Sequence, residues 1–216
     1  FWPVMPPSRF QAMDSVDMLI IVPTGGKLTA QAERLAEAHG QYSGLRCAVV
    51  RADHTYNESS SGTPDATAYR RFLKMLYDRG LPHGIAPRYL LLFGDCAWDN
   101  RMKSSAWQNY SPNDYLLCYQ SENSYSDTHS YCWEDYFGLM DDGEGLHPTE
   151  DVSDLGIGRF PVTTESQARI MVDKTIAHLR RDNAGEWRNR IIVMGDDGDN
   201  NIHMKDANRV ADRIMD

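Results

Sequence analysis

The fold follows from one stretch near the front of the chain, Asp17-Met-Leu-Ile-Ile-Val-Pro-Thr-Gly-Gly26. Its central residues are all apolar and show no alternation with polar ones, which is typical of a strand buried on both faces of a sheet. The two glycines then turn the chain. Apolar residues recur at helical spacing from Leu28 to His39, and Gly40 is predicted to end that helix. The stretch therefore predicts a buried strand followed by a helix.

The same alternation continues as far as residue 95. A buried strand is predicted over Leu45–Val50 and a polar loop over Tyr56–Gly62. The next helix has Thr63 as its N-cap and Pro64 at its first position, and Gly80 and Pro82 stop it. A third strand is predicted over Arg88–Phe93. Parallel strands joined by helices predict an α/β fold. We expect a doubly wound, mostly parallel sheet with helices on both faces.

The second half of the chain is less regular. Residues 96–153 are rich in Ser, Asn, Asp and Tyr, and such a long stretch without helix is usually functional surface. The elements predicted in this half are short candidate strands at Tyr115–Tyr119 and Tyr136–Met140, a strand over Leu155–Phe160, a helix over Ser166–Arg180, a buried strand over Arg190–Met194, an acidic turn over Asp196–Asn201 and a last helix from His203. Residues 1–16 are expected to connect to an upstream region. Residues 17–216 are expected to form the N-terminal portion of one domain, because the chain stops inside that last helix.

Composition excludes several classes of protein. The chain has 216 residues, of which 41% are hydrophobic and 25% charged, values that are ordinary for a globular protein. A formal net charge of −9 argues against binding to a nucleic-acid backbone. No apolar run is long enough to span a bilayer. We therefore expect neither a nucleic-acid partner nor a transmembrane segment in this chain.

The chain has four cysteines, Cys47, Cys96, Cys118 and Cys132, and no CxxC pair, which makes a zinc site improbable. Cys118 and Cys132 could form a disulfide in an oxidising compartment, and free buried thiols fit the pattern equally well. Cys96 follows a predicted strand, where a nucleophile could stand. It would need a base within hydrogen-bond reach, and no histidine follows a strand end with a glycine ahead of it. We therefore do not predict that Cys96 is catalytic.

Acidic residues gather where strands are predicted to end, which is where open parallel sheets bind ligands. These ends carry Gly94-Asp95-Cys96, Asp141-Asp142 and Gly195-Asp196-Asp197. Ordinary turn chemistry explains any one of them. Asp196, Asp197 and Asp199 offer the density of oxygen ligands that calcium needs, although they could equally cap the following helix. Structural calcium is therefore a candidate ligand, and we expect that no cofactor is required for any reaction the protein catalyses.

Three segments together resemble one known family. They are Tyr56-Asn-Glu-Ser-Ser-Ser-Gly-Thr-Pro-Asp-Ala-Thr-Ala-Tyr-Arg70, then Arg88-Tyr-Leu-Leu-Leu-Phe-Gly-Asp95 with Trp98-Asp-Asn-Arg101, and Asp135-Tyr-Phe-Gly138 followed by Asp154-Leu-Gly-Ile-Gly-Arg-Phe-Pro-Val162. Their order resembles the gingipain-type cysteine peptidases of clan CD, and the longer phrases are most similar to the sortase members of that family. The resemblance runs from about Asp17 to the end. It implies a caspase-like α/β catalytic domain, of which residues 17–216 are the N-terminal portion.

The resemblance also implies an activity. Sortase members of the family are cysteine endopeptidases and transpeptidases that remove C-terminal sorting domains from secreted cargo and join the new C-terminus to an anionic lipopolysaccharide. The implied partners are this cargo and other components of type IX secretion, and the implied location is the outer-membrane surface. In the family the catalytic His and Cys follow in later strands. These residues alone are therefore expected to lack both groups and to be inactive.

Four acidic residues can be carried over from the family. Glu134 and Asp135 match the place of the acid that orients the catalytic His, a role that suits a carboxylate. Asp141 and Asp142 match the region that lines the primary specificity pocket. Two other functions stay open. One is a noncatalytic, calcium-stabilised surface binding module of the same fold. The other is a metal-dependent phosphate-transfer domain using Asp95, Asp196 and Asp197, which lacks a phosphate-cradling loop.

Overall fold

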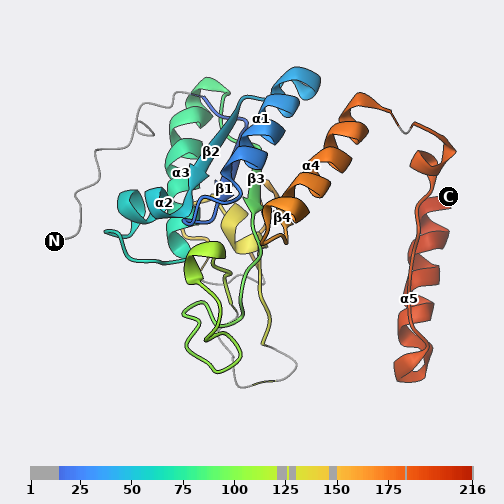
Figure 1. The fold of residues 1–216 in the computed structure, drawn as a ribbon. Coiled ribbons are helices and arrows are strands. Elements are labelled where there is room, and N and C mark those ends of the chain that lie inside the picture. Colours follow the sequence, from blue (N-terminus) through green and yellow to red (C-terminus); the bar gives the residue numbers. More distant parts are fainter. Residues whose placement is uncertain (1–14, 121–125, 127–129, 146–149, 183, 216) are drawn as a thin grey trace. The chain divides into compact units, whose positions relative to one another are not determined.

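The computed structural model describes residues 15–120, 126, 130–145, 150–182 and 184–215. The chain divides into unit 1, Phe1–Arg180, and unit 2, Arg181–Asp216. Unit 1 contains a four-stranded sheet in the order β2-β1-β3-β4 (Figure 1). Its strands are β1 (Met18–Val22), β2 (Cys47–Arg51), β3 (Tyr89–Phe93) and β4 (Gly156–Phe160). The predicted connector, residues 1–16, lies outside the described residues except for Ser15 and Val16.

Every strand pair of this sheet is parallel. Met18 lies opposite Cys47 on one side and opposite Tyr89 on the other, and Tyr89 in turn lies opposite Gly156. The carboxyl ends of the four strands therefore meet at one edge of the sheet. In parallel α/β sheets this edge is where binding sites form.

Helices cover both faces of the sheet (Figure 1), which confirms the predicted doubly wound α/β fold. The helices of one face are α1 (Thr29–Ser43) and α4 (Glu165–Arg180), and those of the other are α2 (Ala52–Ser59), α3 (Thr67–Gly80) and the short 3₁₀ helix η4 (Asp135–Gly138). Strand β1 serves both cores, since Leu19 and Ile21 face α3 whereas Ile20 and Val22 face α1. Burial on both faces explains why its sequence shows no alternation.

Two helix boundaries predicted from the sequence are wrong. Helix α1 continues through Gly40 to Ser43, and Gly44 ends it in a left-handed conformation with φ of 66°. Helix α3 begins at Thr67 instead of Pro64, where the side chain of Asp65 accepts a hydrogen bond from the Thr67 amide at 2.9 Å. In both cases a residue farther along the chain supplies the capping geometry.

The loop predicted over Tyr56–Gly62 is in part helix α2. Its Tyr56 side chain is buried, and the Tyr56 and Tyr69 hydroxyls share a hydrogen bond of 2.6 Å. The Thr55 hydroxyl donates to the carbonyl of Ala52 at 2.7 Å. Packing against α3 therefore imposes helix on a polar sequence with little helical pattern.

Neither candidate strand between β3 and β4 forms. The first contributes only an isolated parallel bridge between Leu116 and Cys96, and the second is largely η4. Two other 3₁₀ turns in unit 1 are η2 (Leu81–His83) and η3 (Pro112–Asp114). The described residues of the segment between β3 and β4, residues 94–155, thus form an irregular excursion held by side chains instead of a strand ladder.

Unit 2 consists of a 3₁₀ turn, η5 (Glu186–Asn189), an extended segment and helix α5 (Gly198–Met215). Asp199, Asn200 and Asn201 have positive φ, so regular helix starts after them, close to the predicted start at His203. The buried strand predicted over Arg190–Met194 is wrong, because Ile192 is 80% and Met194 is 86% exposed. No described helix is long and apolar enough to cross a membrane.

Candidate functional site

A hollow of about 770 Å³ lies at the carboxyl edge of the sheet in unit 1. Thr24 after β1 and Asp53 after β2 line it, together with residues 62–67 and parts of the excursion at 100–101, 112–113 and 117–120. Residues that follow two of the strands therefore line it, together with segments of irregular structure that form its walls. This is the expected place for a ligand in a sheet of this type.

One wall of the hollow is fixed to the turn after β1. The Gly25 amide donates to the Asn113 carbonyl at 2.6 Å, and a Cβ on Gly25 would lie only 2.7 Å from Asp114 Oδ1. Lys27 also pairs with Asp114 at 2.6 Å. Only glycine allows this approach, so the Gly25 of the predicted turn positions the wall.

The floor of the hollow is held by buried polar groups. The Tyr69 hydroxyl accepts a hydrogen bond from the Leu117 amide at 3.3 Å. Asn100 bonds Cys118 twice, since its Nδ2 donates to the Cys118 carbonyl at 2.8 Å and its Oδ1 accepts from the Cys118 amide at 3.0 Å. The side chains of Asn100 and Tyr69 thus replace the missing strand ladder. Sequence reasoning missed both roles, and no periodic signal marks them.

Glu134, a predicted orienting acid, is held at the same edge by Arg159 of β4. Arg159 Nη2 lies 2.9 Å from Glu134 Oε1, and Nε donates to Oε2 at 3.2 Å. Arg159 Nη1 donates to the carbonyl of Gly94, the residue after β3, at 2.9 Å. Asp135, the second candidate, is exposed. The orienting role of either acid stays a prediction. Arg159 was not singled out from the sequence, although the Gly-Arg-Phe-Pro motif contains it.

Cys96 lies beside this ion pair. A hydrogen bond from the Cys118 thiol and the charge of Arg159 lower the Cys96 pKa, and burial opposes them. The neighbouring Cys96 thiol, together with burial, raises the pKa of Cys118, because ionisation of both would place two thiolates side by side. Among the described residues, the groups that act on the Cys96 thiol include no imidazole. The pKa of Cys96 is therefore lowered without a histidine among these neighbours.

All four cysteines are free, so the disulfide between Cys118 and Cys132 that the sequence left open is not formed. The Cys132 thiol nevertheless acts on Cys118, whose pKa it helps to raise. Cys118 is fully buried, whereas Cys132 is exposed.

Asp141 and Asp142 do not follow a strand, because η4 replaces the strand predicted before them. Both are exposed, and Asp142 pairs with Lys74 of α3 at 3.1 Å. The amide of neighbouring Met140 donates to Asp154, which lies just ahead of β4. Neither aspartate lines the hollow described above. Their role in substrate binding stays a prediction.

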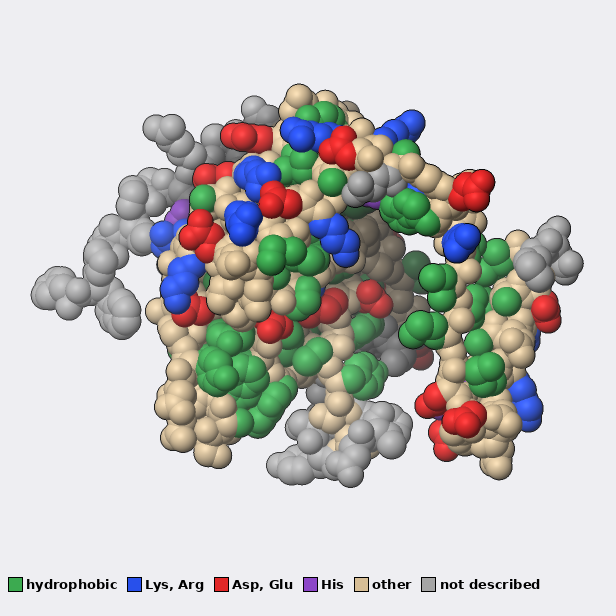
Figure 2. Space-filling view, turned by 45° about the vertical axis from the view of Figure 1, so that its right-hand side comes forward, with side chains coloured by type: hydrophobic (Ala, Val, Ile, Leu, Met, Phe, Trp, Pro, Cys, Tyr) green, Lys and Arg blue, Asp and Glu red, His purple; other side chains and the backbone are tan. Residues whose placement is uncertain are grey.

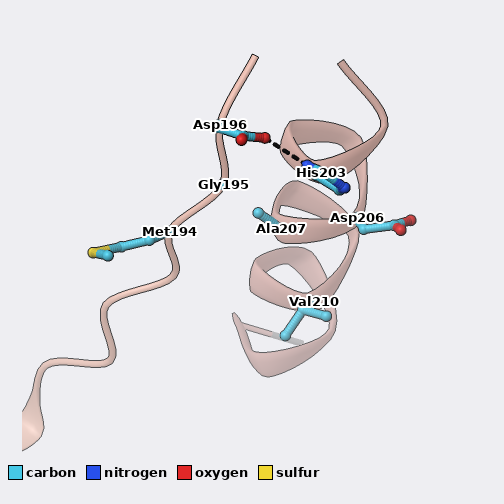
Figure 3. Close-up of a pocket in the computed structure, with 7 residues that line it drawn as sticks. All are labelled: Met194, Gly195, Asp196, His203, Asp206, Ala207 and Val210. Atoms are coloured by element: carbon cyan, nitrogen blue, oxygen red, sulfur yellow. Dashed lines mark hydrogen bonds and ion pairs between the residues drawn. The ribbon is translucent and has the colours of Figure 1, made fainter. Parts of the chain in front are cut away.

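The acidic turn of unit 2 lies against a histidine of its own helix. Asp196 and His203 both line a hollow of about 690 Å³, and their side chains point toward each other (Figure 3), with Asp196 Oδ1 2.5 Å from His203 Nδ1. Asp199 Oδ2 lies 3.9 Å from His203 Nε2. Among the described residues, no group of three or more His, Cys, Asp or Glu side chains could hold a metal ion. Calcium at Asp196, Asp197 and Asp199 stays a prediction, and sequence reasoning missed His203.

The excursion between β3 and β4 also carries an aromatic cluster. Trp107, Tyr110 and Tyr115 lie with ring centroids 5.2 to 6.0 Å apart. Figure 2 shows hydrophobic side chains gathered on the lower part of unit 1, at the height of this excursion in Figure 1. The excursion is therefore held in part by an apolar cluster of its own.

Comparisons with known proteins agree with this architecture. The model of peptidase family C25 matches residues 11–216. The crystal structure of dimeric latent PorU from Porphyromonas gingivalis is similar with a TM-score of 0.74 and 38% identity, over 88% of this chain and 18% of that chain. A structure described only as "Structure of Protease" is similar at 13% identity with a TM-score of 0.53, over 83% of this chain and 32% of that one, and shares the fold. No curated protein matches the sequence.

Proposed function

Because the chain belongs to peptidase family C25, we propose that it is part of a cysteine endopeptidase and transpeptidase that removes C-terminal sorting domains from secreted cargo. The observation that carries this proposal is the 38% identity with PorU over 88% of the chain. The chain spans only 18% of that PorU chain, so the activity belongs to the whole protein. By the same resemblance, the nucleophilic cysteine and its histidine base follow in later strands, and these residues alone are inactive.

In this proposal Glu134 orients the catalytic imidazole. A cysteine attacks a peptide carbonyl as a thiolate, and an imidazole takes its proton and later returns it to the leaving amine. A carboxylate fixes the tautomer and orientation of that imidazole. Glu134 suits this role because Arg159 holds it in an ion pair at 2.9 Å, whereas Asp135 is exposed and forms no ion pair with another described residue. Arg159 is then a positioning residue.

The hollow at the carboxyl edge suits an extended peptide. Its walls offer backbone groups and aromatic side chains such as Tyr56 and Tyr119, and its acidic residues include Asp53 and Asp65. Asp141 and Asp142 are proposed to recognise a basic side chain of the cargo. The proposed location is the outer-membrane surface, and the proposed partners are cargo with sorting domains and other type IX secretion components.

The test is cleavage by the full-length protein of a cargo that carries a C-terminal sorting domain. Glu134→Gln should lower kcat on the order of 10²- to 10⁴-fold, because an amide no longer holds the imidazole in the right tautomer. Asp135→Asn is the matched control and should retain activity within about twofold. Cargo left intact by the wild-type protein, or full activity of the Glu134→Gln variant, would contradict the proposal.

A second candidate is a noncatalytic surface module stabilised by calcium. It rests on the oxygen-rich turn that carries Asp196, Asp197 and Asp199, and calcium binding there would compete with the pairing of Asp196 and Asp199 with His203. Under this proposal, calcium raises the Tm of the wild-type protein, and Asp196→Asn with Asp199→Asn abolishes that rise. If the protein is such a noncatalytic module, it also leaves the cargo uncleaved. A calcium-independent Tm contradicts it.

A further inference from the structure

Three cysteines from separate segments meet at the edge of the candidate site. Cys96 pairs with Leu116 in a parallel bridge, and Gln120 pairs with Cys132 in an antiparallel bridge. In the sequence, Cys118 lies midway between Leu116 and Gln120, the two residues of its own segment that form these bridges. Side chains two residues apart in an extended segment point to the same side. The Cys118 side chain therefore lies on the same side as those of the other two cysteines, and both of their thiols act on its pKa.

The three thiols differ in access to solvent. Cys132 is exposed, Cys96 is half-buried, and Cys118 is fully buried with its Sγ donating to the Ala97 carbonyl at 3.3 Å. A reagent from solvent thus meets Cys132 before it meets Cys118. One sulfur can form only one disulfide, so Cys96 and Cys132 compete for the shared Cys118.

We propose that Cys96, Cys118 and Cys132 form a thiol–disulfide exchange site in which Cys118 is the common partner. A small disulfide, such as oxidised glutathione, is the oxidant. The Cys132 thiolate attacks one of its sulfurs, forms a mixed disulfide and releases one glutathione thiolate. The Cys118 thiol loses its proton and attacks the Cys132 sulfur, and the second glutathione leaves. The two protein thiols together lose two electrons and two protons, which the glutathione disulfide gains.

A second exchange moves the bond inward. The Cys96 thiolate attacks the Cys118 sulfur, a Cys118–Cys96 disulfide forms, and Cys132 leaves as a thiolate, with no net redox change. The lowered pKa of Cys96 supports this step, because a larger fraction of this thiol is ionised near neutral pH. The charge of Arg159 stabilises that thiolate.

The site would act on the segment that carries Glu134. Cys132 lies two residues before Glu134, and Cys118 follows Leu117, whose carbonyl accepts from Arg159 at 3.2 Å. A bond from Cys118 to Cys132 would tie these two segments together, and its transfer to Cys96 would release them. The proposal does not depend on the peptidase function, because its readout is the disulfide itself.

The experiment oxidises the purified, full-length protein in glutathione buffers of graded ratio, blocks free thiols and maps disulfides by peptide mass spectrometry. We expect wild type to yield both Cys118–Cys132 and Cys96–Cys118. Cys132→Ser should leave only Cys96–Cys118, and Cys96→Ser only Cys118–Cys132. Cys118→Ser should lose both bonds. Cys47→Ser, a cysteine outside the site, should retain the wild-type pattern.

Each variant is checked for native circular dichroism. Because Cys118 is buried, the single variants Cys96→Ser and Cys132→Ser keep the test valid if Cys118→Ser does not fold. A direct Cys96–Cys132 bond in wild type would overturn the proposal. The proposal would also be overturned if Cys96, Cys118 and Cys132 all remained reduced in a buffer that contains only oxidised glutathione.

Discussion

Arg159 and Glu134 form an ion pair in which Arg159 Nη2 lies 2.9 Å from Glu134 Oε1, with only 11% of the Arg159 side chain exposed. The same guanidinium donates to the carbonyls of Gly94 and Leu117. One side chain of β4 thus joins the end of β3 to two segments of the excursion. This guanidinium is one of the contacts that attach the excursion to the sheet.

Replacement of Arg159 by Met should lower the free energy of unfolding by about 3 kcal/mol, because it leaves a partly buried carboxylate and two carbonyls without their donor. Urea denaturation measures the effect. The control is Arg34→Gln, which breaks an ion pair with Asp173 whose side chains are both more than 40% exposed. That variant should change the free energy by about 0.5 kcal/mol or less. Equal effects of the two substitutions would contradict the buried role of Arg159.

Asp17 should make stability depend on acid pH. Hydrogen bonds from Arg46 lower the pKa of the buried Asp17 carboxyl from 3.8 to about 2. Since the folded-state pKa lies below the unfolded one, the ionised carboxylate stabilises the fold by about 2 kcal/mol above pH 4, and this is lost as pH falls toward 2. Urea midpoints of wild type and Asp17→Asn should therefore differ at pH 5 and converge near pH 2. A constant difference would rule out this ionisation as the cause.

Replacement by alanine should have opposite effects at Gly40, inside α1, and at Gly44, the residue that ends it. Gly40→Ala should stabilise the protein by about 0.5–1 kcal/mol, because Gly40 lies inside the helix and a Cβ there meets nothing closer than 3.7 Å. Gly44→Ala should destabilise it by about 1 kcal/mol, because the left-handed φ at Gly44 strains any residue with a Cβ. Thermal unfolding distinguishes the two. The reverse order would mean that the helix ends at Gly40, as its sequence predicts.

Cys96 and Cys47 should differ in reactivity toward iodoacetamide. Burial and the nearby Asp17 raise the pKa of Cys47 to about 11, whereas the Cys118 thiol and Arg159 lower that of Cys96. Both side chains are half-buried, so access is matched. At pH 7.5 the reduced protein should be alkylated at Cys96 at least about 10-fold faster than at Cys47. In denaturant the two rates should become equal, and equal rates in the folded protein would refute the difference in ionisation.

The sheet and its covering helices could be predicted because their signal is local. The apolar run of β1 and the apolar face of α3 each lie within a short stretch of sequence, and burial of both gives the expected layers. Boundaries were less predictable. The start of α3 depends on Asp65, one polar residue among several that could cap a helix.

The candidate site could be predicted only in part. Glu134 is a candidate through the family resemblance alone, and its partner Arg159 lies 25 residues away with no periodic relation to it. The prediction of a strand over Arg190–Met194 was wrong for a related reason. An apolar run reports that a strand would be stable when paired, and whether a partner is available is a non-local property that the run itself does not contain.

The parallel pairing of the sheet has a consequence for folding kinetics. Met18 must meet Tyr89, and Tyr89 must meet Gly156, before either contact stabilises the chain. The entropy of closing these long loops is lost before the pairing is gained, so such topologies refold slowly, on the order of milliseconds to seconds. During that interval the apolar strand β1 is unpaired on both edges. Aggregation during refolding should therefore originate from residues 18–22.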